Sequence, residues 1–417
     1  MNPIGNSKYI QQVNKKKILN LIYNAKSISR AEATKMSGIS APTVSRIVDC
    51  LLSEGLVEEI GVGESTGGRR PKLLKIAADN NCIIGLDLGT TNIYGVLADL
   101  NASLIFEERQ PTRIKEGFYQ IMGQTAEIIE ILIAKAREKR IRICGIGLAV
   151  AGLINRQRNI VEFSPNFHWH DADILGVLRG RFDLPIFFDN VTRVMALGEQ
   201  CYGAGKQYKN FVFINVGYGI GAGVIIEGKA LFGSAGMAGE FGHITVDRNS
   251  KIQCDCGNFG CLEALASGQG IARTARMELE KGAQSIIYEM CGGDLEKVTA
   301  ETVAKAAKKG DVLAWNIFTQ AAEYIGLGIS ALINLYNPEA VVLGGGVVQA
   351  GEILFDNVRK TINARALNRS LRGVPLLPAK FGLKAAAMGA VSLVMNKLLE
   401  LELADFLSSY KEERLEL

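Results

Sequence analysis

Apolar positions in the first 76 residues recur at helical spacing and then alternate with polar ones. Three short helices are expected, and residues that favour helix ends bound the second and third. The second should run from Ser29 to Gly38 and the third from Ser40 to Gly55. Alternation at residues 56–60 and 73–76 predicts two strands. Short helices separated by a glycine turn and followed by a hairpin have the spacing of a winged helix-turn-helix.

The rest of the chain alternates apolar strands with amphipathic helices. A strand–turn–strand unit begins at residue 82 and another at residue 211, and each is followed by helices and a further buried strand. This repeated order predicts an α/β protein with two lobes. We expect a DNA-binding domain at residues 1–76, a first lobe at 82–193 plus 388–417, and a second lobe at 194–387.

Charge is distributed unevenly along the 417 residues. The whole chain has a net charge of +4, but residues 1–76 carry 12 Lys and Arg against 6 Asp and Glu. A small basic domain on a near-neutral body favours a polyanionic partner. We expect neither a signal peptide nor a membrane span, and clustered cysteines without a spread disulfide framework fit a reducing compartment. The expected location is the cytoplasm.

The third predicted helix and the wing carry residue types that bind DNA. Thr43, Ser45 and Arg46 stand in the first turns of that helix, where side chains read base edges. Arg69 and Arg70 form a thin cationic tip between the two strands, suited to a narrow A·T-rich minor groove. Three short helices alone also fit a protein-docking module. The positive charge and the paired arginines favour DNA.

One stretch combines residues that ligate metals. It holds His243, Cys254, Cys256 and Cys261, which are one of three histidines and three of eight cysteines. Thiolates and an imidazole at this density favour Zn²⁺ in tetrahedral geometry. Four protein ligands leave no open position, so the expected role is structural. The alternative is a group of buried, inert thiols.

Two carboxylates flank the same stretch. Glu240 precedes His243 by three residues, and Glu263 follows Cys261 by two. If one nitrogen of His243 holds a metal, the other can hydrogen-bond a ligand. Carboxylates and an imidazole suit a polyhydroxyl compound, whose hydroxyl groups donate to them. Asn166 could hold a sugar hydroxyl in the same way. The alternative is that both glutamates are solvated surface residues.

Three glycine-containing turns have the character of anion-binding loops, in which backbone N–H groups approach a phosphate. They do not match the dinucleotide pattern GxGxxG followed by a helix after a strand. The last turn is expected to open a helix. The residues concerned are Asp87, Gly89, Thr90, Gly217, Gly219, Gly344 and Gly345.

Together these motifs resemble the ROK family, named for repressors, open reading frames and sugar kinases. The most specific piece is GMAGEFGH followed by CDCGNFGCLE, and the resemblance covers almost the whole chain. It implies a winged helix-turn-helix followed by the duplicated two-lobe α/β fold of hexokinase and actin. It implies a zinc site at His243 and the three cysteines, and nucleotide contacts, in the kinases, at the three glycine turns. The implied sugar contacts are Asn166, Asn190, Glu240, His243 and Glu263.

The chain departs from the family's kinases at the catalytic base. Those kinases read Glu-Asn-Asp where this chain reads Asp189, Asn190 and Val191, and Val191 accepts no proton. Losing a general base costs about 10²–10⁴ in rate. Asp189 could substitute, but it lies one strand step of about 6–7 Å away. Thr90 and Tyr218 also stand where the kinases carry Gly and Thr.

The sequence therefore predicts a sugar-responsive DNA-binding regulator, a repressor of carbohydrate-utilisation genes, and not an enzyme. Its expected partners are a pseudo-palindromic, A/T-rich double-stranded DNA operator, a monosaccharide effector and a second copy in a homodimer or tetramer. A sugar-transport protein is a further expected partner, and structural Zn²⁺ is the expected cofactor. The alternative is an ATP-dependent sugar kinase that also binds DNA.

Overall fold

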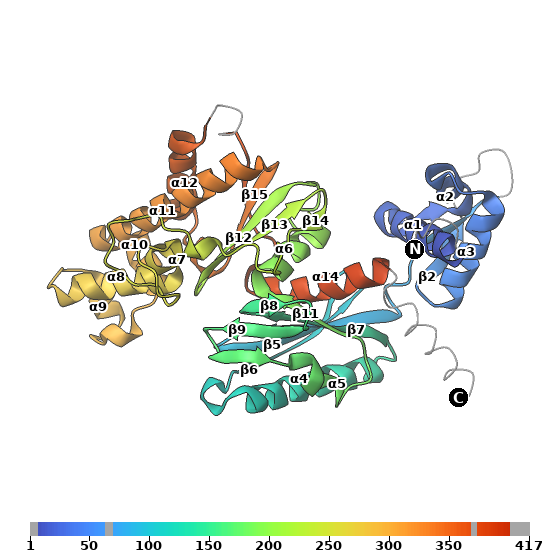
Figure 1. Ribbon diagram of the computed structural model, residues 1–417, viewed down its shortest axis with the longest axis horizontal. Coiled ribbons are helices and arrows are strands. Elements are labelled where there is room, and N and C mark those ends of the chain that lie inside the picture. Colours follow the sequence, from blue (N-terminus) through green and yellow to red (C-terminus); the bar gives the residue numbers. More distant parts are fainter. Residues whose placement is uncertain (1–6, 63–69, 368–372, 401–417) are drawn as a thin grey trace. The chain divides into compact units, whose positions relative to one another are not determined.

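The computed structural model describes residues 7–62, 70–367 and 373–400. The chain divides into two compact units, which Figure 1 shows as ribbons coloured along the sequence. The first unit is Met1–Leu148, Ile174–Phe188 and Ala390–Leu417, and the second is Ala149–Asp173 and Asp189–Gly389.

This division differs from the expected one in two respects. The basic N-terminal domain groups with the first lobe, and residues 149–173 and 189–193, which were expected in the first lobe, group with the second. Side-chain contacts explain the latter, because the Arg156 guanidinium lies 3.8 Å from the Phe232 ring centroid. In addition, Asn190 Nδ2 donates to the Gly152 carbonyl at 3.0 Å.

The N-terminal elements confirm the predicted winged helix-turn-helix. Ser29 caps the second helix in a reciprocal capping box with Glu32, and Gly38 ends that helix at a φ of +69°. The strands form an antiparallel sheet in the order β1-β3-β2. The elements are α1 (Ser7–Ala25), β1 (Ile28–Ser29), α2 (Arg30–Ser37), α3 (Ala41–Ser53), β2 (Val57–Val62) and β3 (Lys72–Ile76).

The first five-stranded sheet has the order β11-β7-β4-β5-β6. Helix α4 packs on this sheet through buried aliphatic residues, and Gly95 permits the contact, since a Cβ there would lie 2.7 Å from Ile128. The elements are β4 (Asn81–Leu88), β5 (Asn92–Asp99), β6 (Leu104–Pro111), η1 (Ile114–Glu116), α4 (Phe118–Glu138), β7 (Arg142–Val150), α5 (Ile174–Arg179), β11 (Ile186–Asn190) and α14 (Ala385–Leu399).

The second five-stranded sheet, β14-β13-β12-β15-β16, repeats the strand order of the first. Counted in chain order, the first strand of each sheet pairs with the second, and the second pairs with the third. The fourth strand pairs with the other edge of the first, and the fifth pairs with the fourth. This repetition confirms the predicted duplicated α/β fold. The strands are β12 (Phe211–Val216), β13 (Ile220–Ile226), β14 (Lys229–Ala230), β15 (Ala340–Gly344) and β16 (Leu376–Pro378), and a separate sheet contains β8 (Leu153–Asn155), β9 (Ile160–Ser164) and β10 (Trp169–Ala172).

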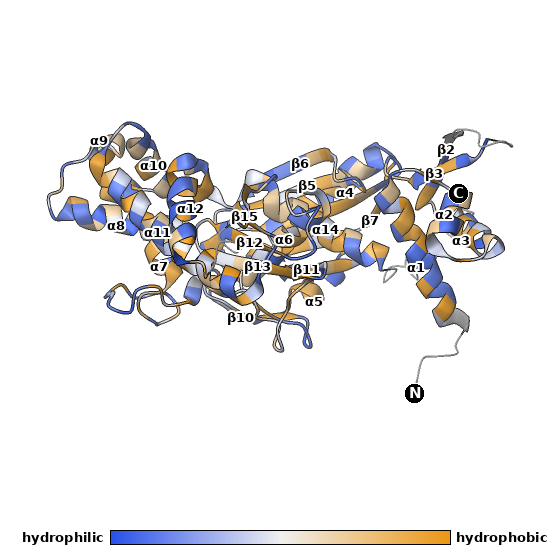
Figure 2. Cartoon of the chain, turned by 90° about the horizontal axis from the view of Figure 1, so that it is seen from above, coloured by the Kyte–Doolittle hydropathy of each residue, from blue (hydrophilic) through white to orange (hydrophobic). Residues whose placement is uncertain are grey.

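Helices surround the second sheet and enclose an apolar core. Helix α11 (Val312–Tyr336) contributes Phe318, Ile325 and Ile329 to this core, and all three side chains are completely buried. Outer helices such as α8 show both polar and apolar residues in Figure 2. The remaining elements are α6 (Val191–Tyr202), η2 (Phe241–His243), α7 (Leu262–Ala266), α8 (Gly268–Glu280), α9 (Ile286–Met290), η3 (Leu295–Lys297), α10 (Ala300–Lys308), α11 (Val312–Tyr336), η4 (Gly346–Ala350), α12 (Glu352–Arg365) and η5 (Gly382–Lys384).

Among the described residues, one stretch is long and apolar enough to cross a membrane. It is Gly382–Leu399, and 72% of it is buried inside the protein. Gly389 in this stretch packs so closely that a Cβ would lie 2.3 Å from the Val194 carbonyl oxygen. Such packing is that of a core helix in a folded domain.

Candidate metal centre and effector site

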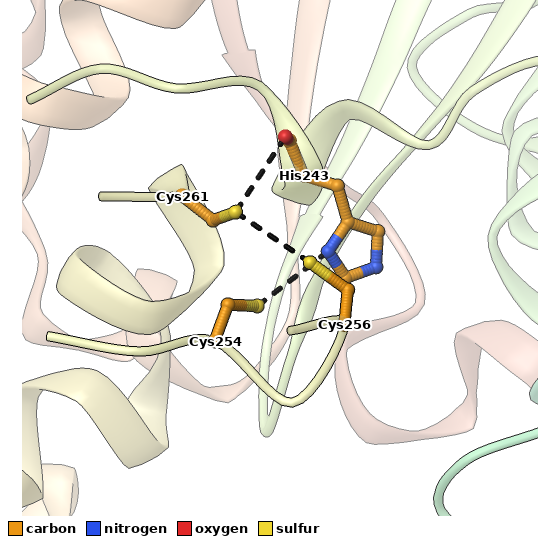
Figure 3. A group of neighbouring side chains, drawn as sticks. All are labelled: His243, Cys254, Cys256 and Cys261. Atoms are coloured by element: carbon orange, nitrogen blue, oxygen red, sulfur yellow. Dashed lines mark hydrogen bonds between the residues drawn. The ribbon is translucent and has the colours of Figure 1, made fainter. Parts of the chain in front are cut away.

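The four predicted metal ligands lie together in the second unit. Their ligand atoms are all within 4.8 Å of one another, and Figure 3 shows the three thiols beside the imidazole. His243 Nδ1 lies 3.6 Å from Cys254 Sγ, and Cys256 Sγ lies 3.7 Å from Cys261 Sγ. Burial raises the pKa of the Cys254 thiol, and it raises that of Cys261 to about 12.

The His243–Cys254 and Cys256–Cys261 separations match the edges of a tetrahedron around one metal ion. With metal–sulfur bonds of about 2.3 Å and a metal–nitrogen bond of about 2.0–2.1 Å, S–S edges are about 3.8 Å and N–S edges about 3.6 Å. Three thiols and one imidazole form a soft donor set. The residues therefore fit a four-coordinate metal site.

Backbone geometry shapes the loop that carries the cysteines. Gly257 has a φ of +92° and Gly260 a φ of +68°, as expected for a tight loop. A Cβ at Gly260 would lie 1.9 Å from the Asp247 carbonyl oxygen. The small apolar cluster here consists of Cys254, Cys261 and Ala264, with Ile252 packed against it. Few apolar contacts therefore hold the shape of this loop.

Three of the predicted sugar-binding residues, Glu240, His243 and Glu263, interact electrostatically. His243 Nε2, the ring nitrogen that does not face Cys254, lies 3.9 Å from Glu240 Oε2. Glu263 stands in the first turn of α7 and accepts a hydrogen bond from Ile220 N at 2.8 Å. Burial raises the pKa of Glu240, and the negative charge of Glu263 raises it further, against opposing effects of His243 and Arg193. One nitrogen and two carboxylates are thus available for a ligand.

The two asparagines differ in their environment. Asn190 caps α6 by accepting from Thr192 N and Arg193 N, and its Nδ2 donates to Gly152 O. Asn166 is exposed in the turn between β9 and β10, and the described residues show no hydrogen bond from it to the other predicted sugar contacts. Trp169, the first residue of β10, is 4% exposed and stacks on Phe167, with the ring centroids 4.3 Å apart.

Arg193 is a residue of this region that the sequence reasoning missed. Its guanidinium donates to both carboxylate oxygens of Asp189 at 2.6–3.0 Å, and both side chains are buried. Its Nη2 also donates to the carbonyl of Gly236, at the start of the GMAGEFGH motif. The i, i+4 spacing of Asp189 and Arg193 was the available signal, but it spans a strand end and a helix start. The carboxylate suggested as a substitute base is therefore held in an ion pair.

Several glycines of the predicted nucleotide turns serve close packing. A Cβ at Gly219 would lie 2.4 Å from Glu263 Oε2, and one at Gly345 would lie 2.4 Å from Val216 O. The turn at Gly344 opens a helix, as expected, but only a short one: the five-residue 3₁₀ helix η4. The longer helix α12 begins at Glu352. Gly351, with a φ of +77°, separates the two.

A cavity of about 790 Å³ adjoins two of these turns. Gly217 and Tyr218 line one part, and Gly346 lines another. Tyr218 is 57% exposed and lines this cavity. The basic residues of the lining are Arg276, Lys305 and Lys308.

Asp87, in the first predicted turn, lies partly buried at the end of β4. Burial raises its pKa from 3.8 to about 7. Between these values the folded chain binds more protons than the unfolded chain, so wild-type stability falls as pH rises, by at most about 1.4 kcal/mol per pH unit. We expect Asp87→Asn to stabilise the protein more at about pH 8 than at about pH 5. Thermal denaturation of the wild type and of Asp87→Asn at about pH 5 and about pH 8 measures this effect. A stability difference between the two proteins that is the same at both pH values would contradict it.

Two of the predicted DNA-contacting residues, Thr43 and Ser45, interact with other side chains of the same domain. Ser45 Oγ accepts from Arg30 Nη1 at 3.3 Å, and the Thr43 and Ser40 hydroxyls lie 2.9 Å apart. Arg46 and Arg70 are exposed. Arg69 lies outside the described residues. Arg46 and Arg70 are therefore free to reach DNA.

A winged helix-turn-helix joined to a duplicated α/β fold with a Cys₃His cluster defines a DNA-binding regulator built on a kinase-like body. A sequence profile of the ROK family matches residues 83–397, and one for winged helix-turn-helix DNA-binding domains matches residues 13–58. The chain belongs to the ROK family.

Three known proteins illustrate the similarity. The xylose repressor of Caldicellulosiruptor bescii is 32% identical over 398 residues, covering 95% of this chain and 98% of that protein. The structure of a ROK family transcriptional regulator, a homologue of the Escherichia coli MLC protein, has a TM-score of 0.84 at 27% identity, covering 96% and 99%. A ROK family glucokinase from Streptomyces griseus in complex with glucose and AMPPNP has a TM-score of 0.67 at 29% identity, covering 75% and 98%.

Proposed function

We propose that this protein is a sugar-responsive, cytoplasmic transcriptional repressor of carbohydrate-utilisation genes whose kinase-like body has lost catalysis. The observation that supports this most is the end of β11. Val191 occupies the base position, and Asp189 is paired with Arg193. A general base must be free to reach the proton it accepts. The proposed sugar contacts Glu240, His243 and Glu263 belong to the same compact unit as this position.

The metal we propose for the Cys₃His cluster is Zn²⁺, held by His243, Cys254, Cys256 and Cys261. When bound, it supplies a structural crosslink and leaves no open coordination position. Nδ1 of His243 faces the cysteines, so Nε2 is left for a sugar hydroxyl together with Glu240. The names of the xylose and N-acetylglucosamine repressors among the relatives support a monosaccharide effector.

The proposed mechanism is linkage between sugar binding and DNA binding. Asn166, Asn190 and Glu263 complete the sugar contacts, and the sugar favours one conformation of the body. To change DNA affinity tenfold, it must prefer that conformation by about 1.4 kcal/mol. In a homodimer or tetramer, two winged helices would read a pseudo-palindromic operator, with Arg46 near bases and Arg69 and Arg70 in an A/T-rich minor groove. A sugar-transport protein is a further proposed partner.

The proposed function is tested with purified protein and three sugars: D-xylose, N-acetyl-D-glucosamine and D-glucose. We expect one sugar to raise the melting temperature of the protein without ATP. The same sugar should change the affinity of the protein for a DNA duplex that has been selected from a random library for binding to it. Adding ATP should yield no sugar phosphate. Glu263→Gln should weaken the sugar-induced shift, because an amide nitrogen that cannot accept a hydrogen bond replaces one of the two carboxylate oxygens, whereas exposed Glu280→Gln should retain it. Sugar phosphorylation at enzyme-like rates would restore the kinase alternative.

A further inference from the structure

The C-terminal end of α3, the predicted recognition helix, is held by side chains of the first five-stranded sheet. Arg142, the first residue of β7, donates from Nη1 to the Glu54 carbonyl at 2.9 Å and from Nε to Asn81 Oδ1 at 2.7 Å. Asn81, the first residue of β4, is 1% exposed and donates to the Gly55 carbonyl at 2.9 Å. Glu54 and Gly55 are the residues at which α3 ends.

A second attachment joins the same domain to the end of α14. Asn20 Nδ2 of α1 donates to the Leu399 carbonyl at 3.2 Å, and Lys16 pairs with Glu400. Lys15, also on α1, pairs with the Glu54 carboxylate at 2.5 Å. The DNA-binding domain is therefore held at two places and is not attached by its linker alone. Through Arg142 and Asn81, the C-terminal end of α3 is joined to the first residues of β7 and β4.

Strand β7 leads from this contact toward the proposed sugar site. It runs from Arg142 to Val150, a length of about 27 Å. Two residues beyond its end, the Gly152 carbonyl accepts the hydrogen bond from Asn190 Nδ2. Asn190 is one of the proposed sugar contacts. A sugar that takes over this amide changes the hydrogen bond at one end of a strand whose other end holds α3.

We propose that Arg142 and Asn81 are positioning residues that couple sugar binding to the orientation of the recognition helix. This inference rests on the proposed function. Arginine is suited to the role because its fork donates in two fixed directions, to Asn81 and to Glu54. Its Nη2 is buried without a hydrogen-bond partner among the described residues, which is unfavourable for stability. This donor is available to a carbonyl of α3 when the helix moves.

The test compares Arg142→Lys, Arg142→Gln and the control Arg137→Gln, an exposed arginine on α4. For each protein, the affinity for the selected duplex is measured with and without D-xylose, N-acetyl-D-glucosamine and D-glucose, and the sugar-induced thermal shift is measured in parallel. We expect the effective sugar to change wild-type and control DNA affinity by about tenfold or more, and that of both Arg142 variants by less than about twofold. The thermal shift should be unchanged in all four.

A variant at a second residue tests the same contact if the Arg142 variants do not fold. Asn81→Asp retains the acceptor for Arg142 Nε but cannot donate to Gly55, so it should also weaken the coupling. Wild-type coupling in the Arg142 and Asn81 variants would overturn the inference while leaving the proposed function intact. Loss of the thermal shift together with the coupling would also overturn it, since the contact would then be merely structural. If no sugar affects the wild type, the proposed function fails first.

Discussion

Replacing Cys261 by serine is expected to release the metal and to abolish sugar binding. Cys261 is completely buried, and its sulfur lies 3.7 Å from that of Cys256. Even partners outside the coordination shell change metal affinity by about 10–100-fold, so losing a ligand should cost at least about 100-fold. The loop from Thr245 to Cys261 would then lose its crosslink, and His243 would no longer be oriented toward a sugar. Metal content by mass spectrometry and sugar-induced thermal shift check both effects.

Cys291→Ala is the matched control for this variant. Cys291 is also buried, but it lies at the end of α9 and outside the cluster. We expect it to retain metal and sugar response. A chelator should reproduce the effect of Cys261→Ser on the wild type, and added Zn²⁺ should reverse it. Full sugar response in metal-free protein would contradict the proposed role of the cluster.

Arg193→Met is expected to lower the free energy of unfolding by about 3–5 kcal/mol. The Arg193 side chain is 3% exposed and the Asp189 side chain 6% exposed. Removing one partner leaves the other charge buried without compensation, and the donor to the Gly236 carbonyl is lost as well. Denaturant unfolding measures the difference.

The double variant Asp189→Asn, Arg193→Met should recover part of this loss, because it leaves no buried charge. Lys281→Met is the control. It removes one partner of the exposed pair Lys281–Glu278, with N–O distance 2.7 Å, and should change stability by less than about 1 kcal/mol. Equal effects of Arg193→Met and Lys281→Met would show that burial of the Asp189–Arg193 pair is not what makes it important.

Local sequence signals predicted most of the elements because they act over a few residues. Ser29 and Gly38 bound α2 through hydrogen bonds and backbone angles that neighbouring residues determine. The predicted hairpin turn after Val216 formed between β12 and β13 for the same reason. The helix predicted after Gly345 forms only as the short 3₁₀ helix η4, and helical periodicity does not predict the positive φ of Gly351 that separates it from α12.

The clustering of His243 with the three cysteines could be predicted before the fold was known, because residues this close in sequence need little long-range organisation to meet. The same holds for the basic DNA-binding domain, whose charge and helix caps are properties of a short segment. Long-range contacts decided the rest. The pairing of Asp189 with Arg193, the capping role of Asn190 and the hold of Arg142 on Glu54 depend on strand ends and helix ends meeting in space. No local sequence pattern specifies these long-range contacts, because they form only when the apolar core packs.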